Sequence, residues 1–372
     1  MIYFGVFFLS SILCILGDFF KKNKFLYIAL FLYFSAVLLV SFFAAIRDYG
    51  IGTDMTVYGT RWFQNSSIYY DFSKYMNSIS WEGAEIGYAY LNYLISRFTN
   101  NSNIFYFILS FITNGLVMLA LYEFRARFSI SLAWLSYLLI FYGYTFNLLR
   151  QGLAMAIVLY GITLFLNNKP KLGLLFLGGA FLFHESAIFI LILISGLYFL
   201  VIKSKNISKT ILFIFAIGVF ILVFFNQLIN IIWKLGLLSE KYYAYVLGSE
   251  SLEGITFFGL ILKLPIILLF TWLYNSIVKK DKNLTFLFVM IIFDYIFFQL
   301  RIISPVFLRI SYYFWILQVI SVPYILEKVS IKFDKFILIV IYLIYIIFVF
   351  WYYIIYLKYN AIYPFTSQFM GI

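Results

Sequence analysis

Long apolar runs separated by short polar breaks fill most of the 372-residue chain. A helix needs about 20 predominantly apolar residues to cross a bilayer. By that criterion the pattern predicts 12 membrane-spanning helices, some of them short or re-entrant, and we expect an all-α polytopic membrane protein with a single transmembrane domain, 1–372. The predicted spans are 2–20, 25–46, 104–122, 128–146, 149–166, 171–183, 186–202, 210–229, 257–277, 284–300, 310–326 and 336–357.

The composition supports this prediction and excludes several other classes of protein. Hydrophobic residues make up 65% of the chain and charged residues 11%, whereas a soluble domain carries about 45–50% and about 25%. A soluble enzyme, a disordered chain and a collagen are therefore excluded. Cys14 is the only cysteine, so no intramolecular disulfide can form.

The net charge of +12 indicates how the chain is oriented. Six short breaks at alternate ends of the predicted spans hold 16 of the 27 lysines and arginines. The positive-inside rule places these breaks on the cytoplasmic side. Both termini then face outward, and the charge requires no nucleic-acid partner.

Arginine is distributed differently from lysine. Six of the eight arginines fall on the predicted outer side, where a planar, permanently charged fork suits bidentate binding of phosphate or carboxylate. These six are Arg47, Arg61, Arg97, Arg150, Arg301 and Arg309. The outer side also holds two longer segments, 47–103 and 230–256. The first includes an amphipathic stretch, 86–98, that we expect to lie in the membrane plane.

The first outer segment opens with two glycines between Arg47 and Asp54, which allow unusual backbone angles beside an anion site. An ordinary polar turn is the alternative. Glu85 follows, before the amphipathic stretch, where a solvated loop is the simpler interpretation. Arg150 starts a predicted span, and a helix N-terminus favours anions rather than cations. We therefore favour a functional role for Arg150 over simple snorkelling.

His184 is the only histidine and lies beside Glu185 between two apolar runs. Ionisable groups at membrane depth are costly and often functional, and histidine transfers protons near neutral pH. A satisfied structural histidine is the alternative. Arg301 and Arg309 flank Pro305 and form either surface anchors or an anion clamp. Lys263 and Asp294 lie deeper, and we expect them to neutralise each other. One histidine and one cysteine give no zinc motif of the usual spacing, and no nucleotide-binding fingerprint is present.

These residues, taken in order, resemble the EpsG-like family, a branch of the Wzy-type bacterial O-antigen and capsule polymerases. The matching stretches are RDYGIGTDMTVY at 47–58, EIGYAYLNYL at 85–94, LLRQGLAMAI at 148–157, FLFHESAIFIL at 181–191 and LRISYYF at 308–314. The family positions carried over are Arg47, Gly52, Thr53, Asp54, Glu85, Arg150, His184 and Arg309. Arg301 lies outside the matched stretches and is added on its chemistry alone.

The resemblance implies a GT-C-like helical fold and a polymerase at the periplasmic face of the bacterial inner membrane. Such enzymes join oligosaccharide repeat units carried on undecaprenyl pyrophosphate, without a metal or other cofactor. The growing chain moves to the non-reducing end of a new unit. A chain-length regulator is a further candidate partner, and the lipid bilayer surrounds the protein.

The chemistry of that reaction assigns roles to the candidate residues. Arg150 and Arg309, with Arg47 and Arg301 in support, would stabilise the departing pyrophosphate. His184 is the first candidate for the base that receives the acceptor's proton, and Asp54 and Glu85 compete with it. A lipid-linked oligosaccharide flippase and an O-antigen ligase are the alternative functions. A flippase needs a site reachable from both sides, which the one-sided arginines disfavour.

Overall fold

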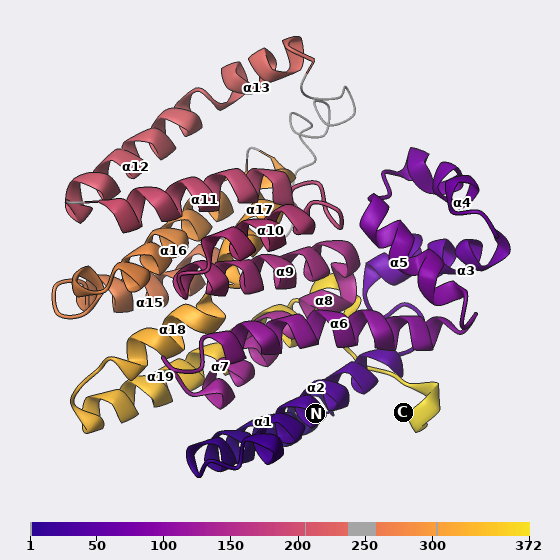
Figure 1. The fold of residues 1–372 in the computed structure, drawn as a ribbon, viewed down its shortest axis with the longest axis horizontal. Helices are drawn as coiled ribbons and strands as arrows, with labels where there is room; N and C mark the ends of the chain where they lie inside the picture. The colour runs from indigo at the N-terminus through magenta and orange to yellow at the C-terminus, as the bar shows by residue number, and fades with distance from the viewer. Residues whose placement is uncertain (1, 205, 237–257, 303) are drawn as a thin grey trace. The chain divides into compact units, whose positions relative to one another are not determined.

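The computed structural model describes residues 2–204, 206–236, 258–302 and 304–372, and its regular elements are all helical in these ranges (Figure 1). The first helices are α1 (Ile2–Lys22), α2 (Leu26–Ala45), α3 (Thr60–Ile68), α4 (Phe72–Ile79), α5 (Ile86–Ser96), α6 (Ser102–Glu123), α7 (Ile130–Tyr137), α8 (Tyr144–Asn147) and α9 (Leu149–Leu166). They are followed by α10 (Pro170–Ala180), α11 (Ala187–Lys203), α12 (Ile207–Val223), α13 (Phe225–Lys234), α15 (Phe258–Trp272), α16 (Lys282–Leu300), α17 (Pro305–Trp315), α18 (Gln318–Glu327) and α19 (Lys332–Phe350). The all-α prediction is confirmed.

Seven helices in the described part of the chain are long and apolar enough to cross a membrane. They are Ile2–Lys22, Leu26–Ala45, Ser102–Glu123, Leu149–Leu166, Lys282–Leu300, Pro305–Glu327 and Lys332–Tyr356. Shorter apolar helices cover Ile130–Tyr142, Ala187–Lys203 and Phe258–Trp272. The chain is therefore a multi-pass helical membrane protein by length and composition, and the count of 12 spans stays a prediction.

The contacts divide the chain into two compact units, one of residues 1–188 and 329–372 and the other of residues 189–328. The prediction of a single transmembrane domain also stays a prediction. In the first unit α9 is the most buried of the candidate spans, because α6 and α10 pack on it. Gly161 of α9 and Gly173 of α10 allow this close approach, since a Cβ atom on Gly173 would lie 2.8 Å from the Gly161 carbonyl oxygen. Small residues permit such backbone contact between membrane helices.

Polar contacts hold the ends of several helices together in the first unit. The Asp18 carboxylate near the end of α1 accepts hydrogen bonds from Ser129 and Ser131 at the start of α7. Glu123 at the end of α6 accepts a hydrogen bond from Lys169, which precedes α10, at 2.6 Å. Three of the basic breaks, those after α1, after α6 and before α10, are therefore close together. The predicted alternation of the spans stays a prediction.

The helices α3, α4 and α5 carry most of the first predicted outer segment, 47–103, and Figure 1 shows them grouped at one end of the long helices of this unit. The helix Ile86–Ser96 matches the expected amphipathic stretch, 86–98. Trp62, Phe63, Tyr75 and Tyr88 are buried between these short helices. The segment thus forms a small packed layer.

The second unit contains a buried ion pair between two of its helices. Lys263 of α15 lies 2.6 Å from a carboxylate oxygen of Asp294 on α16, and both side chains are almost fully buried. The expected mutual neutralisation is confirmed. The other predicted outer segment, 230–256, begins within α13, and its residues 237–256 lie outside the described residues.

Candidate functional site

Arg150 and Glu85 form a largely buried ion pair at the start of α9. The Nη1 atom of Arg150 lies 2.5 Å from Oε2 of Glu85 and 2.8 Å from the carbonyl oxygen of Gly83. The two side chains are 18% and 7% exposed. Burial raises the pKa of Glu85, and the positive charge of Arg150 opposes that rise. The Glu85 carboxylate thus balances the positive charge of Arg150, which the sequence places at a helix N-terminus.

Two aromatic rings form a wall beside this ion pair. The guanidinium carbon of Arg150 lies 4.5 Å from the ring centre of Tyr58 and 5.1 Å from that of Trp62. The Tyr58 hydroxyl donates a 2.6 Å hydrogen bond to Asp54 and also interacts with Arg150. Burial is the main reason that the pKa of Tyr58 is raised. Asp54, Tyr58, Arg150 and Glu85 therefore form one connected polar chain.

Two buried polar atoms in this site lack a hydrogen-bond partner in the structure. They are the Nε of Arg150 and the hydroxyl of Tyr88. Tyr88 is fully buried, and its ring centre lies 6.2 Å from those of Tyr58 and Trp62. Unsatisfied buried donors cost free energy, so such groups favour a ligand or water that can accept from them.

Asn147 connects the Gly-Thr-Asp turn to the helix that carries Arg150. Its Oδ1 accepts hydrogen bonds from the Thr53 hydroxyl and from the backbone N–H of Asp54. Gly52 has a φ of +89°, and a Cβ atom there would collide with the carbonyl oxygen of Phe146. The sequence pattern indicated the glycines but missed Asn147. The one sequence feature that could have indicated Asn147 is its position, three residues before Arg150.

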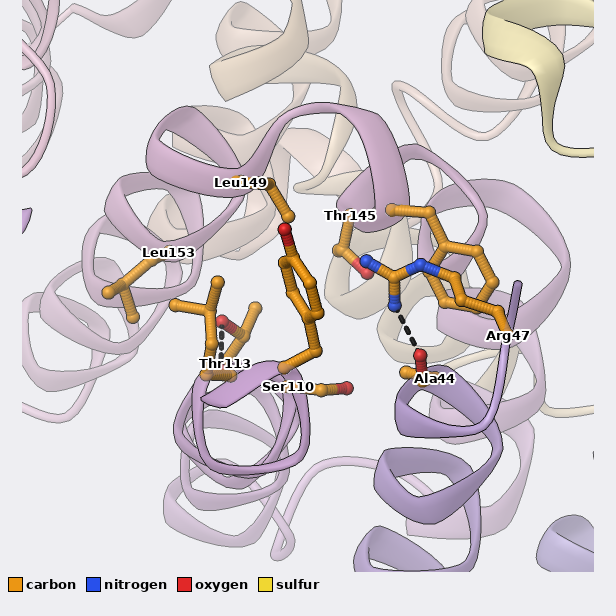
Figure 2. Close-up of a pocket in the computed structure, with 10 residues that line it drawn as sticks. Ala44, Arg47, Ser110, Thr113, Thr145, Leu149 and Leu153 are labelled. Atoms are coloured by element: carbon orange, nitrogen blue, oxygen red, sulfur yellow. Dashed lines mark hydrogen bonds between the residues drawn. The ribbon is translucent and has the colours of Figure 1, made fainter. Parts of the chain in front are cut away.

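Arg47 is buried, and the structure gives its guanidinium two backbone acceptors and two aromatic rings. Its Nε donates to the carbonyl oxygen of Ile51 at 3.2 Å, and its Nη1 donates to that of Ala44. The guanidinium carbon lies 4.8 Å and 4.5 Å from the rings of Tyr106 and Phe146. Figure 2 shows Arg47 and its hydrogen bond to Ala44 among the residues that line a cavity.

This cavity has a volume of about 10 Å³, the size that holds about one water molecule. Arg47 also lies next to the turn that contains Gly52. These contacts give Arg47 a structural function at the end of α2. Its expected role toward pyrophosphate stays a prediction.

His184 lies in the turn between α10 and α11, and this turn packs against the start of α5. The Gly87 N–H donates a 2.7 Å hydrogen bond to the carbonyl oxygen of Leu182. A Cβ atom on Gly87 would lie 2.6 Å from that oxygen, so only glycine allows the approach. The Nδ1 atom of His184 lies 2.7 Å from the Ser186 hydroxyl. The structure therefore brings the predicted His184 turn to the segment that begins with Glu85.

Arg301 and Arg309 belong to the second compact unit. Arg301 is buried, stacks on the Phe298 ring at 3.8 Å and donates to the Phe298 carbonyl oxygen. Arg309 is exposed on α17. Among the residues that the structure describes, no three His, Cys, Asp or Glu side chains are grouped in a way that could hold a metal ion.

A model of the EpsG family matches residues 30–367, which include every candidate site residue. The chain belongs to the EpsG family. Membership in this family indicates a function like that of a polysaccharide polymerase, which is a type of glycosyltransferase. No curated protein and no solved structure matches the chain. The GT-C-like architecture therefore stays a prediction.

Proposed function

We propose that this protein is a polysaccharide polymerase that joins oligosaccharide repeat units carried on undecaprenyl pyrophosphate. The growing chain is transferred to the non-reducing end of a new unit, at the periplasmic face of the inner membrane. The observation that carries the proposal is the buried Arg150–Glu85 pair beside the His184 turn. With Asp54, which is connected to Arg150 through Tyr58, the site combines a permanent cation, two carboxylates and a histidine-bearing turn in one unit of a multi-pass membrane protein of this family.

The transfer requires one bond to form and one to break. The acceptor hydroxyl oxygen attacks the anomeric carbon of the growing chain, and the bond from that carbon to the pyrophosphate oxygen breaks. The electron pair leaves with undecaprenyl pyrophosphate, whose charge the arginines stabilise. The hydroxyl proton passes to a base on the protein.

Arg150 is the first candidate for the group that binds the pyrophosphate. Its side chain is partly exposed, and its Nε has no acceptor among the described residues. Preorganised donors in a water-poor site stabilise developing negative charge by several kcal/mol, with about 3 kcal/mol typical for one donor. Arg309 and Arg301 belong to the second unit, and the roles expected of them from the sequence stay predictions. Arg47 supports the Arg150 site through the Gly52 turn.

His184 is the first candidate for the base. The Ser186 hydroxyl hydrogen-bonds to Nδ1 and orients the ring. Asp54 and Glu85 remain competitors, although each already accepts a hydrogen bond, from Tyr58 and Arg150 respectively. Neither the transfer nor the assigned roles require a metal or other cofactor. The lipid-linked units and the bilayer are the proposed partners, with a chain-length regulator as a further one and no nucleic acid.

Reconstitution of the purified protein in vesicles with an undecaprenyl-pyrophosphate-linked repeat unit tests the proposal. A ladder of oligomers with release of undecaprenyl pyrophosphate supports a polymerase. Transbilayer movement of the unit without a ladder would identify the alternative, a flippase. Transfer only to an added lipid A acceptor would identify an O-antigen ligase instead.

A further inference from the structure

Trp81 is the most exposed tryptophan in the part of the chain that the structure describes, with 73% of its surface accessible. It lies in the short 3-10 turn Ser80–Glu82 that follows α4. Its indole Nε1 donates a 2.9 Å hydrogen bond to the carbonyl oxygen of Ser78, which fixes the ring while its faces stay open. The indole therefore presents an open aromatic face to its surroundings in a defined orientation.

The turn that holds Trp81 is part of the candidate site. Glu82 accepts hydrogen bonds from Arg61 and from the indole of Trp62, whose ring faces Arg150. Gly83, with a φ of +77°, directs its carbonyl oxygen to Arg150. Two residues span at most about 7 Å. Trp81 therefore lies close to the backbone that Arg150 binds.

The surroundings of Trp81 differ from those of a membrane anchor. Two exposed polar residues, Asn77 and Ser80, precede it in the chain, and the Arg61 side chain that binds Glu82 is half exposed. On α5, by contrast, Ile86, Tyr90 and Leu94 form an exposed apolar stripe at four-residue spacing, which suits a lipid surface. The two exposed faces of this layer thus have different chemistry.

We propose that Trp81 is a stacking platform for a sugar ring of the glycan, with Arg61 and Asn77 as polar partners for its hydroxyls. One face of a pyranose presents several C–H groups, which pack on the electron-rich face of an indole ring. Ligand sites combine such an aromatic surface with a few polar groups. This inference rests on the proposed polymerase function, because that function supplies the saccharide.

Kinetics of the reconstituted protein test the platform. With the lipid-linked repeat unit isolated from the producing cells as substrate, Trp81→Ala is expected to raise KM about tenfold, with kcat nearly unchanged. Trp81→Phe should restore most of the affinity, because it keeps an aromatic face. Phe98→Ala is the matched control, since Phe98 is also highly exposed, at 84%, but lies beyond the other end of α5. An unchanged KM for Trp81→Ala, or an equal rise for Phe98→Ala, would overturn the proposal.

A binding measurement separates this inference from the proposed function. The water-soluble glycan released from the same repeat unit should change the tryptophan emission of the wild-type protein and leave that of Trp81→Phe unchanged. This result would stand even if the wild-type protein made no oligomer ladder. Quenching by brominated lipids that disappears in Trp81→Phe would instead show that Trp81 is an interfacial anchor, and the saccharide platform would be wrong.

Discussion

The guanidinium group of Arg150 binds the Glu85 carboxylate at 2.5 Å, although 65 residues separate the two positions in the chain. The contact joins the first turn of α9 to the residue before α5. Both side chains are largely buried, so each charge depends on the other for its stability. The proposed chemistry requires that the arginine also reach an anion.

Arg150→Lys tests whether the planar fork matters for the reaction. Lysine keeps the charge but presents a point cation without bidentate geometry. We expect kcat/KM for polymerisation to fall about 10- to 100-fold, with little change in thermal unfolding. Arg97→Lys is the matched control, because Arg97 binds the backbone of Ser66 and stacks on Tyr93 instead. Full activity of Arg150→Lys would remove Arg150 from pyrophosphate binding.

His184→Asn tests the proposed base. Loss of a general base costs a factor of about 10² to 10⁴ in rate, so we expect a fall of that size in kcat at unchanged expression and membrane insertion. Ser186→Ala should have a smaller effect, since it removes only the group that orients the ring. If His184→Asn polymerises normally, His184 is not the base. The same measurement on Asp54→Asn and Glu85→Gln then tests the two remaining candidates.

Two substitutions test whether close packing of the Gly52 turn matters. Both place alanine at a positive φ, so they share the same backbone strain. Gly50 and Gly52 both have positive φ, +104° and +89°, but only at Gly52 would a Cβ atom collide with another residue. Gly50→Ala should lower the free energy of unfolding by about 1 kcal/mol. Gly52→Ala should cost about 1–3 kcal/mol more and also reduce activity, because it displaces the Thr53–Asn147 contact. Equal effects of the two variants would contradict this account.

Glu85 should give the protein a measurable dependence of stability on pH. Its folded-state pKa is raised above the ordinary value of 4.5 by burial, so the folded protein binds its proton more tightly than the unfolded chain does. The contribution of Glu85 to stability is therefore complete below pH 4.5 and is lost as the pH rises through the raised pKa. The melting temperature of Glu85→Gln, measured over the same pH range, should lack this part of the slope. Parallel curves for the two proteins would show that Glu85 is not the group responsible.

Lys263 and Asp294, in the second compact unit, should contribute to stability in a coupled way. Lys263→Met or Asp294→Leu alone leaves a buried charge without its partner, which costs about 3–5 kcal/mol. The double variant should lose much less than the sum of the two, because it replaces both charges with apolar groups. Unfolding of the four proteins in detergent gives this double-mutant cycle, and additive losses would argue against the pairing.

The amino-acid sequence by itself predicted the helical class, because apolar runs in a bilayer must satisfy their backbone hydrogen bonds within helices. The predicted span 149–166 coincides with α9, and the expected amphipathic stretch matches α5 to within two residues. The sequence also indicated Arg150, Glu85, Asp54 and His184 as chemically unusual positions. These are local signals, since each depends on residue type and on the neighbours along the chain.

Which of those residues meet was decided only by the tertiary structure. Packing of α5 and of the Gly52 turn against the start of α9 pairs Arg150 with Glu85, places Asn147 between two segments and encloses Arg47 between two rings. No periodicity encodes such contacts, because they join positions 59 to 99 residues apart through side chains of ordinary type. The sequence determined which charged residues the chain contains. The fold determined which of them have a hydrogen-bond or ion-pair partner within the protein.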